Sequence, residues 1–71
     1  MERVTAKAVA QSLEAAIARL TESLSHAKLG LAPSEFAAFQ KSVGLAIGRF
    51  SHELLDPIYA EHPDLAPPGV L

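Results

Sequence analysis

Apolar side chains recur along residues 3–29 at alternating steps of four and three, with polar residues between them. This heptad-like spacing places the apolar positions on one face of a helix. Lys7, Glu14 and Glu22 fall on the opposite face, so the predicted helix is amphipathic and wet on one side. The apolar seam comprises Ala6, Ala10, Leu13, Ile17, Leu20, Leu24, Ala27 and Leu31.

A second amphipathic pattern predicts a helix over residues 34–55. At about 100° per residue, its main apolar stripe stays within a narrow sector of one face. Because the connection to the first helix is short, the two should lie antiparallel with their stripes facing inward. The predicted fold class is therefore all-α, a helical hairpin. The second stripe comprises Phe36, Phe39, Val43, Ile47, Phe50 and Leu54.

The ends of the two helices carry their own signals. Lys28 can interact with the last carbonyls and Gly30 suits a left-handed cap, which predicts that the first helix ends near Leu29. The second helix has two possible starts. Either Ala32 is the cap with Pro33 in the first turn, or Ser34 is the cap.

The second helix also carries a strip of small residues about a quarter-turn from its apolar stripe. Two glycines inside a helix cost about 1 kcal/mol each relative to alanine, so a compensating contact is expected. One interpretation is a close approach of a helix from another subunit. The others are that the glycines admit large side chains of the first helix, or that they are merely tolerated. The strip comprises Ala37, Gly44, Gly48 and Ser51.

Asp56-Pro57 interrupts the second helical pattern, because proline lacks the N–H group and disfavours helical geometry in the preceding residue. With Asp56 as cap, a short turn or helix is predicted over residues 57–62. The proline-rich tail, residues 63–71, is expected to lack regular structure. The segment around the break is the most individual part of the chain, so it is the predicted partner contact. Its candidate residues are Asp56, Tyr59, Glu61 and His62.

Size and composition favour self-association. A chain of 71 residues buries a small share of its surface on folding, and the absence of cysteine excludes disulfides and thiolate zinc sites. Oligomerisation is the remaining means of stabilisation, so the hairpin is expected to dimerise into a four-helix bundle. The ten large seam residues predicted for this core are Leu13, Ile17, Leu20, Leu24, Phe36, Phe39, Val43, Ile47, Phe50 and Leu54.

The charge distribution and the few possible ligand residues argue against nucleic-acid, membrane and metal binding. The net charge is −2 and the basic residues are spread singly, which gives phosphate binding little support. No stretch reaches bilayer length and the start of the chain does not resemble a secretion signal, so a cytoplasmic protein is expected, with no membrane partner. His52 and Asp56 have a spacing that a metal can bridge, but pairing on a helix face explains it equally well.

No serine, histidine and acid stand in a spacing typical of nucleophilic catalysis. We therefore expect no enzyme activity, no cofactor and no metal. The leading prediction is a small interaction module of regulatory, adaptor or inhibitor type that binds itself and a further protein. A ligand carrier or small enzyme is the first alternative, with a site inside the bundle beside Phe36, Phe39, Phe50, Gly44 and Gly48. A dimeric nucleic-acid-binding protein is the second.

Overall fold

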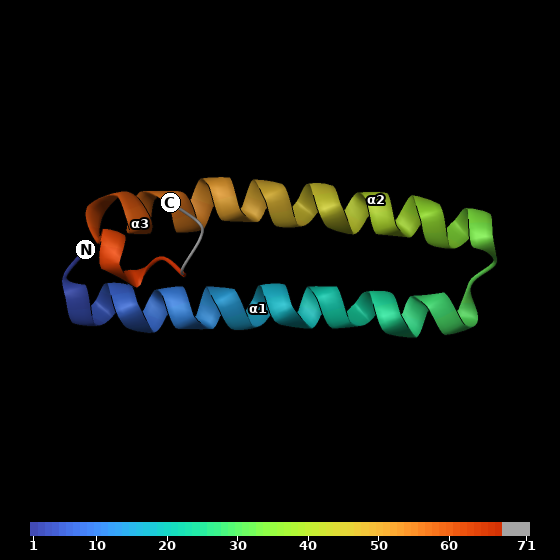
Figure 1. The fold of residues 1–71 in the computed structure, drawn as a ribbon, viewed down its shortest axis with the longest axis horizontal. Helices are drawn as coiled ribbons and strands as arrows, with labels where there is room; N and C mark the ends of the chain where they lie inside the picture. Colours follow the sequence, from blue (N-terminus) through green and yellow to red (C-terminus); the bar gives the residue numbers. More distant parts are fainter. Residues whose placement is uncertain (68–71) are drawn as a thin grey trace.

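The computed structural model describes residues 1–67, and all its regular elements are helical, as predicted. Helix α1 spans Arg3–Gly30 and α2 spans Pro33–Phe50. A π-helical turn, Ser51–Leu55, joins α2 to α3, Asp56–Glu61, and a 3₁₀ turn covers Pro63–Leu65. Figure 1 shows α1 and α2 side by side and antiparallel, with α3 folded toward α1 at the end that holds the N-terminus. The helical hairpin is confirmed.

Helix α1 ends one residue after its predicted end at Leu29, so the connection to α2 is shorter than predicted. Gly30 remains inside α1, so its predicted left-handed conformation is wrong. The chain instead leaves the helix at Leu31, whose backbone is extended and whose N–H donates to the Ala27 carbonyl at 2.9 Å. That bond satisfies a terminal carbonyl without requiring a glycine conformation.

Helix α2 adopts the first of the two predicted starts. Ala32 is the N-cap residue, and Pro33 occupies the first turn, where its missing N–H is no loss. The Glu35 side chain reaches back, and its Oε1 accepts a hydrogen bond from the Ala32 N–H at 3.1 Å. The same carboxylate lies at the positive end of the helix.

The expected break at Asp56-Pro57 is a bend, with helical backbone continuing through it. In the π turn the Asp56 N–H donates to the Ser51 carbonyl, five residues earlier. The wider turn makes room for the Pro57 ring, which would otherwise collide with the preceding turn of an α-helix. Asp56 keeps helical dihedral angles and its side chain caps nothing, so the capping role predicted for it is wrong.

The π turn also changes which of two neighbouring leucines is buried. Leu54, predicted in the apolar stripe, is 45% exposed, whereas Leu55 is 4% exposed and lies in the core. A π turn accommodates one residue more than an α-helical turn. The register therefore advances by one, and Leu55 takes the place that a constant helical period assigns to Leu54.

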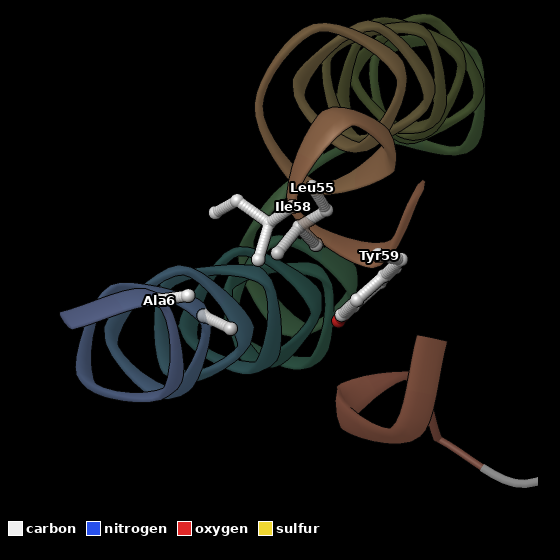
Figure 2. Packing of buried hydrophobic residues seen from close by; sticks show 5 residues of the cluster. Ala6, Leu55, Ile58 and Tyr59 are labelled. Atoms are coloured by element: carbon white, nitrogen blue, oxygen red, sulfur yellow. The ribbon is translucent and has the colours of Figure 1, made fainter. Parts of the chain in front are cut away.

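The buried core lies at the α3 end of the hairpin. Figure 2 shows Leu55 and Ile58 lying between α1 and α2, and Tyr59 reaching toward α1. Small side chains on α1 let α3 approach closely, since Ala6 and Ala10 are buried there. The 3₁₀ turn contributes Leu65, so the predicted tail is regular and packed over its first residues. Residues 68–71, also predicted as tail, lie outside the described part.

The apolar stripes of α1 and α2 are only partly covered along their length. Within the second stripe Val43 alone is buried, while Phe36, Ile47 and Phe50 are half-buried. Phe39 is 38% exposed. The large residues of the α1 seam are half-buried too, because one neighbouring helix cannot enclose a stripe. These half-buried α1 residues are Leu13, Ile17, Leu20 and Leu24.

Candidate interaction surfaces

Two sides of the hairpin differ in chemistry. At about 100° per residue, Leu20 and Ala27 lie on one edge of the α1 seam, and Phe39 and Ala46 lie on one edge of the α2 stripe. Because α1 and α2 are right-handed and antiparallel, these two edges lie on the same side of the hairpin. We call this side the apolar flank, comprising Leu20, Ala27, Phe39 and Ala46.

The glycine strip, comprising Ala37, Gly44, Gly48 and Ser51, lies on the other side by the same geometry. Glu14 of α1 belongs to that side too, since Glu14 and Ser51 line one pocket. A Cβ atom added at Gly44 or Gly48 would have no atom of another element within 4 Å. The interpretation that these glycines admit side chains of α1 is therefore wrong. A contact with another subunit stays a prediction.

A single hydrogen bond ties α3 to α1 on the glycine-strip side. The Tyr59 hydroxyl donates to Glu14 Oε1 at 2.5 Å, across 45 positions of sequence. Burial raises the pKa of Tyr59 to about 12, aided by the hydrogen bond and charge of Glu14 and by the charge of Asp56. The phenol is therefore held in its neutral, hydrogen-donating form.

The four predicted partner-contact residues make contacts within the chain. Tyr59 is 6% exposed, so its ring is not presented to a partner as predicted. Asp56 Oδ2 lies 3.3 Å from His52 Nδ1, and His62 Nε2 lies 2.9 Å from the Met1 carbonyl, to which it can donate. Sequence reasoning missed these contacts within the chain, because no local pattern links residues so distant. A contact between this segment and a partner stays a prediction.

The ends of the described chain are also joined by charge. Glu61 Oε1 lies 2.8 Å from the Met1 amino nitrogen, and Arg3 pairs with Asp64. The hydrogen bond to the ammonium, together with its charge, holds the pKa of Glu61 below its ordinary value. All four partners are exposed, by 38% or more, so each pair contributes little stability by itself.

A pocket of about 270 Å³ opens between α1 and the π turn. The aromatic residues proposed for a ligand site, Phe36, Phe39 and Phe50, are not among its lining residues. A second pocket, of about 280 Å³, lies beside Arg3, Lys7 and Asp64. The first is lined by Glu14, Ile17, Ser51, Leu55, Asp56, Tyr59 and Pro67.

Residues 1–67 contain neither a cluster of metal ligands nor a membrane-spanning helix. Within that range no group of three histidine, cysteine or acidic side chains is placed to hold a metal ion, and His52 and Asp56 form an exposed pair on one helix face. No helix in the described part is long and apolar enough to cross a membrane.

A scan against protein-family profiles gives no match for this chain, and searches of curated proteins and of solved structures give none either.

Proposed function

We propose that this chain is a small, non-catalytic helical interaction module that acts as a homo-oligomer in the cytoplasm. Two hairpins pair into a four-helix bundle. The observation that carries this proposal is the uneven cover of the hairpin: α3 shields one end, while Phe39 remains 38% exposed and Leu20 and Leu24 are half-buried at the other. A third and fourth helix from a second copy would enclose these side chains.

The apolar flank is the surface we assign to this contact. It is continuous with the half-buried stripes of both helices, so a second copy would extend an existing core. In a two-fold arrangement the apolar flank of one copy packs against the same flank of the other. Each copy then buries the same apolar surface. Every square ångström of apolar surface removed from water contributes about 25 cal/mol.

The polar surface supports a role without nucleic acid. Several basic side chains are already paired with acids along the helices, with Arg19 Nη1 3.2 Å from Glu22 Oε2 and Arg49 Nε 2.9 Å from Glu53 Oε1. The net charge of the sequence is −2. Such a surface gives little attraction to phosphates. A regulatory, adaptor or inhibitor role, with a further protein bound by the assembled bundle, fits this surface.

Tyr59, whose pKa is raised, has a structural part in this proposal. Tyr59 has a pKa of about 12 and donates to Glu14, so it exchanges protons poorly near neutral pH. Its part is to hold α3 on α1.

The test is the solution mass of the chain across a dilution series, with helicity followed by circular dichroism in the same samples. We expect a dimer or larger assembly that loses helicity on dissociation. Phe39→Asp should shift the mass to the monomer. Leu45→Asp is the matched control, because Leu45 is 67% exposed on the outer face of α2 and should leave assembly intact. A helical monomer that is stable to dilution would overturn the proposal.

A further inference from the structure

The pocket between α1 and the π turn is lined mainly by apolar surface, with polar groups contributed by Glu14, Ser51 and Asp56. Ile17, Leu55 and Pro67 provide aliphatic surface, and the Tyr59 ring adds an aromatic one. Ser51 and Leu55, at the two ends of the π turn, both line this concavity. π turns inserted in helices are frequent at functional sites.

The charge around the pocket has one sign. Among the described residues, its lining includes the carboxylates of Glu14 and Asp56 and no lysine, arginine or histidine. Glu14 Oε1 accepts the Tyr59 hydroxyl at 2.5 Å, which orients the carboxylate beside the pocket and leaves it further acceptor capacity. Tyr59 also lines the pocket, and the face of an aromatic ring attracts cations.

We propose that this pocket binds a small organic cation, an ammonium group carried on a compact apolar or aromatic body. Its volume of about 270 Å³ lies just below the range of about 300–1,000 Å³ usual for ligand sites, so the ligand is compact. The apolar body lies against Ile17 and Leu55, and the ammonium donates to Glu14 and Asp56. An anion would meet two carboxylates, and a neutral polar group would lose the charge-assisted bonds.

This site is distinct from the proposed assembly surface. The pocket lies on the glycine-strip side, and the apolar flank lies on the other side of the hairpin. The two proposals therefore rest on different residues, so that failure of one does not imply failure of the other.

The first experiment titrates the ¹⁵N-labelled full chain with phenethylamine and follows amide shifts by NMR. Two matched compounds keep the aromatic body, phenethyl alcohol without charge and 3-phenylpropionate with a negative charge. We expect the amine to bind at about millimolar concentration, as suits so small a ligand. Shifts should centre on Glu14, Ser51 and Tyr59. The alcohol should bind about tenfold more weakly, the typical loss of a charge-assisted bond. Equal binding of amine and alcohol, or no saturable shift, would overturn the proposal.

Variants then test the assignment of the carboxylates. Glu14→Gln should weaken phenethylamine binding about tenfold. Glu22→Gln is its control, because Glu22 lies on the same helix away from the pocket and should change nothing. If Glu14→Gln fails to fold, the more exposed Asp56→Asn takes its place and should weaken binding several-fold. Unchanged affinity in a folded Glu14 or Asp56 variant would show that the carboxylates do not hold the ligand.

Discussion

The two ends of this hairpin have the same pair of helices but differ in what covers them. At the α3 end, Leu55, Ile58 and Tyr59 fold over Ala6 and Ala10, and all five are buried. At the turn end, Leu31 and Phe39 are each 38% exposed. Six residues of extra helix make this difference, because they add a third wall. Two amphipathic helices define a direction for a core, and a third element encloses it.

The largest expected effect comes from placing a charge in the buried core at the α3 end. Ile58→Asp places a carboxylate where the side chain is 6% exposed, which should cost about 4 kcal/mol and leave little folded protein. Urea unfolding followed by circular dichroism measures the loss. Ala60→Asp is the control, because Ala60 is exposed on the same helix and should change stability little. A stable Ile58→Asp protein would contradict the assignment of the core to this end.

A charge within the apolar stripe of α2 should act through both folding and assembly. Ile47 is half-buried in α2, so Ile47→Asp should cost about 2–3 kcal/mol, less than the change at Ile58. The solution mass should fall at the same time. Folded protein of unchanged mass and stability would mean that the second stripe belongs neither to the hairpin core nor to an interface.

The Tyr59–Glu14 bond should make stability depend on alkaline pH. The pKa of Tyr59 is raised from 10.0 to about 12 in the folded chain, so its contribution is complete below pH 10. It is lost as the pH rises toward 12. Since the sequence has a single tyrosine, phenolate absorbance titrates this group alone.

Tyr59→Phe removes the bond and the titrating proton together. It should cost about 1.5–3 kcal/mol at neutral pH, the usual loss for a hydrogen bond to a charged group. The fall in stability between pH 10 and 12 should be smaller than in the unaltered chain. Identical pH profiles for the two proteins would show that another group governs alkaline stability.

The smallest effect tests the glycine strip. A methyl group added at Gly48 would meet no atom of another element within 4 Å, so Gly48→Ala should stabilise the monomeric hairpin by about 0.5–1 kcal/mol. Gly48→Leu separates the two remaining interpretations. Reduced assembly with retained helicity would place the strip between subunits, whereas unchanged mass would remove it from the interface.

Much of the fold follows from local patterns. Alternating apolar steps predict both helices, and Pro33 with Glu35 predicts the start of the second, because these signals act within one or two helical turns. The exchange of Leu54 for Leu55 could not be predicted in this way. A stripe drawn with a constant period assumes that every turn is α-helical, and the π turn breaks that assumption.

The sites were less accessible from sequence than the helices. The pocket depends on Glu14 meeting Tyr59, and nothing near either residue signals a partner 45 positions away. The prediction of a left-handed cap at Gly30 was wrong for a different reason. A left-handed cap and an extended exit at Leu31 both satisfy the last carbonyls, so the sequence was compatible with either.

The long-range contacts at the α3 end affect the order in which the chain folds. Its contacts join Tyr59 to Glu14 and His62 to Met1, across 45 and 61 positions. Such contacts require the chain to lose the entropy of a long loop before they return any stability. The short connection at Leu31 and Ala32 brings the turn-end halves of α1 and α2 together first, yet that half buries least. The early hairpin should therefore be weak and short-lived, and the docking of α3 should be the step that commits the chain to its native state.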